Sequence, residues 1–217
     1  MTESKKIDSS IQKNRYFKKE LHVLIPFIKR PWKSFTISEI KTALNTNSHN
    51  YVYDALEHFS KCVLLKEKHG STNIYKINPD AVNLDPLILS ETIIKCNSTH
   101  IPYTIFQVMQ KKLKTSYYTL LVTGSFASRT QSETSDIDVA IIIPSGNKKP
   151  FEIALSQGEL TIPEVHGFVF TEEEFYQMLI NDSYNYGKEC AKNHIILHGA
   201  EAYYTLLLRG LKNGFKG

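Results

Sequence analysis

Two aspartates separated by a single residue, Asp136 and Asp138, open an apolar run that ends at Ile143. The run predicts a buried β-strand, on which residues two apart project from the same face. Paired carboxylates repel each other unless a cation lies between them. Mg²⁺ prefers hard oxygen ligands, usually one or two carboxylates together with the phosphates of a substrate. We therefore predict that Asp136 and Asp138 are metal ligands and that their chemistry is phosphoryl or nucleotidyl transfer.

A glycine and a serine, Gly124 and Ser125, follow a predicted buried strand over residues 118–122, and ten residues separate them from Asp136. Glycine permits a backbone turn that a side chain would obstruct, and its amide can approach a phosphate. Ser125 adds a hydroxyl at the start of a predicted helix, whose exposed N–H groups favour an anion. Gly124 and Ser125 are thus predicted to bind phosphate opposite the carboxylate pair.

This layout suits in-line attack on a nucleoside triphosphate (NTP), in which one Mg²⁺ ion holds the triphosphate and a second activates the attacking hydroxyl. The combination of strand, Gly124-Ser125, spacing, Asp136-Ile137-Asp138 and apolar strand resembles the DNA polymerase β-like nucleotidyltransferase superfamily. The compact size is similar to its minimal nucleotidyltransferase (MNT) group. The resemblance covers roughly residues 101–175. It implies a small mixed-sheet domain, two Mg²⁺ ions, NTP as substrate and transfer of a nucleoside monophosphate.

The chain departs from the family pattern just after the Gly-Ser turn. Family members often have a glycine where this sequence has Arg129. Arg129 is predicted to join the nucleotide-binding residues by contacting phosphate, and the alternative is that its side chain crowds the loop.

A second departure concerns the third carboxylate, which the family supplies from a later strand. Thr171 and Glu174 form a capping box, so a helix is predicted to begin there, and counting back from it places the expected carboxylate nearest His166. Glu164 lies two residues earlier on the same strand face. We predict that Glu164 is the third catalytic residue and that His166 is a candidate ligand or base. Structural roles for Glu164 and His166 are the alternative, and Glu159 is a weaker candidate.

The first third of the chain is predicted to contain a helix, a short strand, a helix, a turn, a helix and a hairpin. This order is similar to that of a winged helix-turn-helix by pattern only, because no signature motif is present. In such folds the second helix of the motif enters the major groove and the wing can touch the phosphate backbone. The candidate nucleic-acid contacts are His49, Asn50 and Tyr53 on that helix and Lys66 and Lys68 on the wing. Protein contacts are the alternative use of this surface.

The length of 217 residues and a hydrophobic content of 41% favour a globular protein with two modest domains. The predicted fold class is α/β (α+β), with a winged helix followed by a small mixed-sheet nucleotidyltransferase domain. The predicted divisions are a flexible arm 1–14, a winged helix 15–80, a linker 81–100 and a nucleotidyltransferase domain 101–217.

Charge is distributed unevenly along the chain. Residues 1–80 hold 14 Lys and Arg against 8 Asp and Glu, whereas the remainder holds 12 against 14. A basic first third and a mildly acidic remainder suggest different partners for the two parts.

Membrane and disulfide-rich classes are excluded on composition. No apolar run reaches the ~18 to 20 residues that a membrane span needs, and no apolar centre of a signal peptide is present near the start. The three cysteines are widely spaced and form no Cys-x-x-Cys pair, so neither a disulfide framework nor a zinc site is predicted. A cytoplasmic location and no membrane partner are expected.

Two functions therefore stand as hypotheses. The first is a Mg²⁺-dependent nucleotidyltransferase that moves a nucleoside monophosphate, AMP in the first instance, to a protein, RNA or small-molecule acceptor. The second is a catalytically weak protein that senses NTP and binds DNA as a regulator, or acts as an antitoxin. Minimal nucleotidyltransferases are often partners of HEPN-domain toxins, so the resemblance also implies a HEPN-type toxin as a partner.

Overall fold

The computed structural model describes residues 19–98, 101, 103–132, 134–156 and 164–217. The chain divides into two compact units, residues 1–93 and 94–217. Each unit contains helices and one sheet, so the predicted mixed α and β class is confirmed. The predicted arm, residues 1–14, lies outside the described residues. Within the described ranges, no helix is both long enough and apolar enough to cross a membrane.

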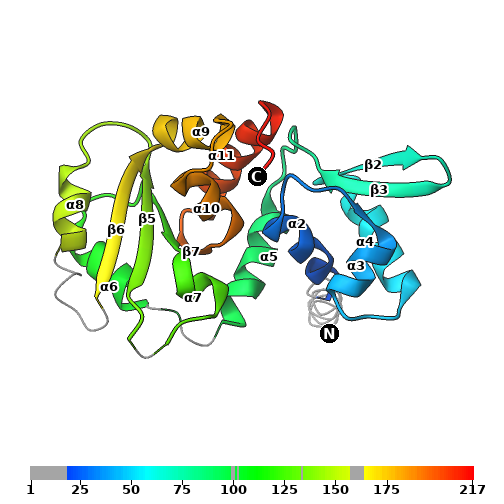
Figure 1. Cartoon of the computed structure of the whole chain (residues 1–217), viewed down its shortest axis with the longest axis horizontal. Helices are drawn as coiled ribbons and strands as arrows, with labels where there is room; N and C mark the ends of the chain where they lie inside the picture. Colours follow the sequence, from blue (N-terminus) through cyan, green and yellow to red (C-terminus); the bar gives the residue numbers. More distant parts are fainter. Residues whose placement is uncertain (1–18, 99–100, 102, 133, 157–163) are drawn as a thin grey trace, which may run out of the picture. The chain divides into compact units, whose positions relative to one another are not determined.

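The first unit has a three-stranded antiparallel sheet of order β1-β3-β2, shown in blue and cyan in Figure 1. Its elements in chain order are the 3-10 helix η1 (Leu21–Leu24), α2 (Ile25–Lys29), β1 (Phe35–Thr36), α3 (Ile37–Ala43), α4 (His49–Phe59), β2 (Leu64–His69) and β3 (Thr72–Ile77). The apolar face of α4 is buried, with Val52, Leu56 and Phe59 fully enclosed. The elements follow the predicted order, and the assignment as a winged helix stays a prediction.

A further helix, α5 (Asp85–Cys96), lies within the stretch 81–100 that was predicted as a linker. In the first unit Leu87 and Ile93 are buried, and the Ser90 hydroxyl donates to the Leu21 carbonyl oxygen over 3.0 Å. Ser90 and the buried Glu91 interrupt the apolar face in sequence, and for that reason the helical pattern was not recognised.

The second unit contains a four-stranded sheet of order β6-β5-β4-β7, in which only β5 and β6 run parallel. Its elements are α6 (Tyr103–Lys112), β4 (Thr119–Val122), α7 (Gly124–Ser128), β5 (Ile137–Ile143), α8 (Lys149–Ser156), β6 (Val165–Thr171), α9 (Glu172–Ile180), α10 (Tyr186–Lys192), β7 (Ile195–His198) and α11 (Ala200–Lys212). Parallel neighbours need a crossover connection, and α8, which the sequence analysis did not predict, lies in that connection.

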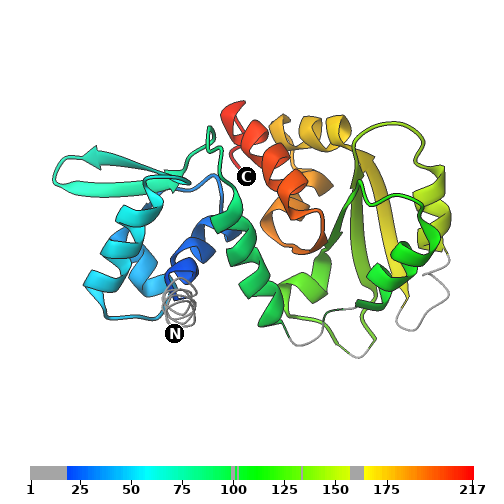
Figure 2. The ribbon, with the colours of Figure 1, turned by 180° about the vertical axis from the view of Figure 1, so that it is seen from behind.

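The two faces of this sheet are covered by different helices. On one face, the alternate residues Ile137, Val139 and Ile141 of β5 join one apolar cluster with residues of α6 and α8, which lie together on that side in Figures 1 and 2. Because side chains alternate along a strand, Asp138 and Ala140 project to the opposite face. That face is contacted by α9 and α11, and α10 is joined to it through Tyr186.

The end of β6 is fixed by the predicted capping box. The Thr171 hydroxyl accepts from the Glu174 amide over 3.2 Å, and the Glu174 carboxylate accepts from the Thr171 amide over 2.8 Å. Helix α9 therefore begins at the predicted position, immediately after β6. This junction anchors β6, which has His166 near its other end and is directly preceded by Glu164.

Candidate active site

The turn between β4 and α7 lies directly against the first carboxylate strand. The amide of Thr123 donates to the Asp138 carbonyl oxygen over 2.8 Å, which ties the turn to β5. Gly124 has a φ of +60°, and a Cβ placed on it would lie only 2.1 Å from Oδ2 of Asp138. The Asp138 carboxylate therefore packs against the bare Gly124 backbone, where no side chain fits.

Helix α10 holds this turn from a second direction. The Asn193 side-chain amide donates to the Gly124 carbonyl oxygen over 3.0 Å, and a hydrogen bond of 2.9 Å joins the hydroxyls of Thr123 and Tyr186. Burial, reinforced by the neighbouring Cys190, raises the pKa of Tyr186 well above its usual range, and the Asp138 charge acts in the same direction. Tyr186 is therefore a neutral phenol at any physiological pH.

Thr123, Tyr186 and Asn193 were not recognised in the sequence. Tyr186 begins α10 and Asn193 follows its last residue, so the two are seven positions, about two helical turns, apart. That spacing was the available signal, but nothing in the sequence indicated that the two residues would meet the Gly-Ser turn.

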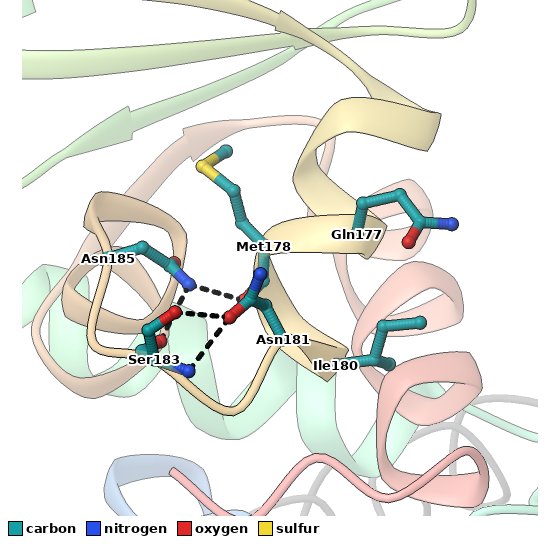
Figure 3. A pocket seen from close by; sticks show the side chains of 6 residues that line it. All are labelled: Gln177, Met178, Ile180, Asn181, Ser183 and Asn185. Atoms are coloured by element: carbon teal, nitrogen blue, oxygen red, sulfur yellow. Dashed lines mark hydrogen bonds between the residues drawn. The ribbon is translucent and has the colours of Figure 1, made fainter.

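The loop that precedes α10 fixes the position of that helix. Figure 3 shows a pocket at this loop, lined by residues of α9 and of the segment 181–185. The Asn185 side chain accepts from the Lys188 amide and donates to the Met178 carbonyl oxygen over 2.8 Å, so it caps α10 and holds it to α9. The pocket contains none of the predicted site residues, and its polar groups serve to place α10.

Four polar side chains gather where β5 and β6 begin. In the parallel register Asp138 lies beside His166, and the Ile137 amide donates to the Glu164 carbonyl oxygen over 2.8 Å. His166 lies between two carboxylates, with Nδ1 3.9 Å from Asp136 and Nε2 3.5 Å from Glu164. Both separations exceed the usual N–H···O range of 2.7–3.2 Å. All three side chains are about half exposed, so they are open to a ligand.

Ser125 and Arg129 occupy opposite ends of α7. Ser125 stands in its first turn beside Gly124, and its hydroxyl makes no hydrogen bond to another described residue. Arg129 ends the helix in the left-handed region, with a φ of +61°, and its guanidinium donates to the Ser98 hydroxyl over 3.4 Å. A left-handed backbone favours glycine, in agreement with the glycine that the family resemblance leads us to expect at this position. Ser125 is therefore adjacent to the turn, Arg129 lies one helical turn further along with its amide donating to the Ser125 carbonyl oxygen, and a phosphate contact by Arg129 stays a prediction.

The carboxylates fit a metal that arrives with its substrate. Among the described residues there is no group of three or more His, Cys, Asp or Glu side chains placed to hold a metal by themselves. Asp136 and Asp138 offer hard oxygen atoms that are partly open to solvent, and Mg²⁺ commonly takes one or two carboxylates and completes its shell with phosphates and water. The donor set therefore suits a magnesium–nucleotide complex. Glu159 lies outside the described residues.

The candidate nucleic-acid residues form an exposed group in the first unit. On α4 the rings of His49 and Tyr53 stack with centroids 6.3 Å apart, and the Lys66 amine lies 5.9 Å from the Tyr53 ring. Lys66 also pairs with Glu57 over 2.6 Å, and this contact lowers the pKa of Glu57. Asn50 and Lys68 are exposed. The structure thus brings His49, Tyr53 and Lys66 together, but Glu57 compensates the Lys66 charge.

We predict that Gly124→Ala disrupts the candidate site more than its backbone strain alone would. The added methyl group would meet the Asp138 carboxylate, so binding of magnesium–NTP should fall by at least about tenfold and the melting temperature should drop. Gly70→Ala is the matched control, because Gly70 has the same φ of +60° with nothing within 4 Å of its Cβ position. The Gly70→Ala variant should lose about 1–2 kcal/mol of stability from left-handed strain. Its nucleotide affinity should equal that of the wild type. Equal nucleotide affinity of the Gly124→Ala variant and the wild type would show that nucleotide binding does not depend on this contact.

Comparison with protein families identifies one match. Residues 102–193 match the family model described as nucleotidyltransferase domain. Comparison with the curated proteins and with the solved structures gave no match. The matched segment runs from the start of α6 to the end of α10 and contains the Gly-Ser turn, both aspartates, Glu164 and His166. Residues 102–193 are thus similar to a nucleotidyltransferase domain, and this similarity supports the predicted polymerase β-like superfamily.

Proposed function

We propose that the second unit is a magnesium-dependent nucleotidyltransferase that moves a nucleoside monophosphate, AMP in the first instance, from an NTP to an acceptor hydroxyl. The observation that carries this proposal is the Asp138 carboxylate packed against the Gly124 backbone, with Asp136, Glu164 and His166 beside it. A phosphate group that lies on the turn would be next to the carboxylates. The match to the nucleotidyltransferase domain supports the same reading.

The proposed reaction uses these residues for binding and proton transfer. The acceptor hydroxyl attacks the α-phosphorus of the NTP, a new oxygen–phosphorus bond forms, and the bond to the β-phosphate oxygen breaks to release pyrophosphate. Gly124 and Ser125 would orient the triphosphate, and Asp136 and Asp138 would hold Mg²⁺. When bound, Mg²⁺ neutralises phosphate charge and promotes loss of the acceptor proton. Glu164 would complete the carboxylate set, and His166 could receive the proton.

The acceptor is a protein, an RNA end or a small molecule. A HEPN-type toxin is the protein partner that the resemblance to minimal nucleotidyltransferases suggests, and it stays a prediction. A carboxylate pair on a rigid strand serves any of these acceptors, because the acceptor contributes only a hydroxyl to the reaction.

Removal of either aspartate charge should abolish the activity. Asp136→Asn and Asp138→Asn retain the side-chain shape and remove a metal ligand, so label transfer from α-labelled NTP should fall by about 100-fold or more, equivalent to about 3 kcal/mol. The assay incubates each protein with α-labelled ATP, GTP, CTP or UTP and Mg²⁺, with and without added RNA. Asp182→Asn is the control, because Asp182 is an exposed loop aspartate after α9. Unchanged transfer by both site variants would disprove the proposed role of the pair.

Glu164 is expected to act in the reaction step. Glu164→Gln should lower label transfer by about 10²-fold or more, in the range of acid–base and carboxylate contributions, with little change in NTP affinity. Titration with magnesium–NTP separates the two quantities. Loss of affinity without loss of transfer at saturation would assign Glu164 to substrate binding instead.

The second candidate function is an NTP sensor without turnover. The observation that favours it is His166, which lies beside Asp138 at the position where the family's third carboxylate is expected. In this reading the wild type binds magnesium–NTP but transfers no label, and His166→Asp gains transfer by restoring a carboxylate. His166→Asn is its control, because it cannot supply the charge. Transfer by the wild type would remove this candidate.

The sensor reading assigns DNA binding to the first unit as a winged helix. The exposed group of His49, Tyr53 and Lys66 on α4 and β2, with Asn50 and Lys68 nearby in sequence, supports that assignment. Lys68→Glu should weaken binding to duplex DNA and reduce the slope of log affinity against log salt by about 1. Lys112→Glu on α6 is the control, and fluorescence anisotropy at several salt concentrations is the measurement. No salt-dependent binding by the wild type would exclude DNA as the partner.

A further inference from the structure

An exposed aromatic ring lies on the same sheet face as the carboxylates. Phe168 is 54% exposed, although it stands in a strand rather than in a loop. In the register of β5 and β6, the Ala140–Phe168 pair follows the Asp138–His166 pair by two residues. Two residues of extended strand span about 6.6 Å, and side chains two apart share a face. The ring therefore lies one side-chain position along the sheet from the candidate metal ligands.

The Phe168 ring is held in place by other aromatic side chains. The Tyr186 ring meets it edge to face with centroids 5.1 Å apart, and the Phe170 ring is stacked at 6.3 Å. Tyr186 and Phe170 also touch each other, with centroids 6.0 Å apart. The Tyr186 hydroxyl is also hydrogen-bonded to the hydroxyl of Thr123, which lies in the turn before α7. One set of contacts thus fixes the ring relative to the turn that is proposed to bind phosphate.

A fixed ring with a free surface suits a planar ligand. Every nucleobase has a π-face, and stacking of a base on an aromatic side chain is worth about 1–3 kcal/mol. The ribose of a nucleotide separates its base from its α-phosphate by a span similar to two residues of strand. With the α-phosphate at the carboxylates, the base of the same molecule can reach Phe168.

We propose that Phe168, supported by Tyr186 and Phe170, is the platform on which the nucleobase of the NTP stacks. This inference rests on the proposed nucleotide site and adds the position of the base. A purine is the expected base, because its two fused rings offer the larger stacking surface. Stacking does not depend on the hydrogen-bonding groups of the base, so ATP and GTP should gain similar affinity from this contact. Both should bind more tightly than CTP and UTP.

The test compares a ligand that has a base with one that has none. The full-length wild type and Phe168→Ala are titrated calorimetrically with magnesium–ATP and with magnesium–tripolyphosphate. Phe168→Ala should weaken ATP binding by about 5- to 150-fold, the range that one stacked base corresponds to, and leave tripolyphosphate binding within about twofold. Phe168→Trp should retain ATP binding, whereas Phe168→Leu, which is apolar without a π-face, should resemble Phe168→Ala. Ile153→Ala is the control, because Ile153 is 51% exposed on α8, which covers the other face of the sheet.

The outcomes separate this inference from the proposed function. Binding of neither ligand by the wild type would refute the nucleotide site itself. Binding of both ligands by the wild type, with ATP affinity unchanged in Phe168→Ala, would overturn the platform and leave the phosphate site standing. Equal loss of both ligands in Phe168→Ala would also overturn it, because the effect would not depend on the base. A change of oligomeric state in Phe168→Ala with unchanged ATP affinity would identify the ring as a subunit contact.

Discussion

The contact between the Asp138 carboxylate and the Gly124 backbone is the constraint on which the candidate site depends. A side chain at residue 124 would occupy the space that the carboxylate fills, so glycine is the only residue that allows β4, α7 and β5 to meet this closely. The Thr123 amide bond to β5 and the Asn193 bond to the Gly124 carbonyl oxygen hold the same point from two sides. Contacts within the protein thereby hold together the groups that are predicted to bind phosphate and metal, which reduces the free-energy cost of ordering them on binding.

The elements that carry the site followed from local sequence signals. Asp136 and Asp138 stood at the start of a continuous apolar run, and Thr171 with Glu174 marked a helix start, so β5 and the junction of β6 with α9 were predicted at nearly their observed positions. The mixed sheet was implied by the family resemblance. These features are local, or belong to a motif whose spacing is short, and one sequence contains them in full.

The rest of the site could not be predicted because it depends on contacts between distant segments. Tyr186 meets Thr123 across 63 residues and Asn193 meets Gly124 across 69, and neither pair leaves a pattern in the sequence. His166 was recognised as the residue nearest the third-carboxylate position, but only strand register shows that it lies beside Asp138 and between two acidic groups. Arg129 stays a predicted phosphate contact, and its left-handed backbone and its bond to Ser98 were not apparent from the sequence.

The order of the strands has a consequence for how the domain is made. Strand β7 (Ile195–His198) is the last strand in chain order and lies at the edge of the sheet. It pairs with β4 (Thr119–Val122), which is an interior strand. During synthesis, about seventy further residues must be made after β4 before its second neighbour, β7, leaves the ribosome. Pairing between segments so distant in sequence is slow. The half-built sheet would expose an apolar strand edge in the meantime, a surface that invites aggregation or capture by a chaperone.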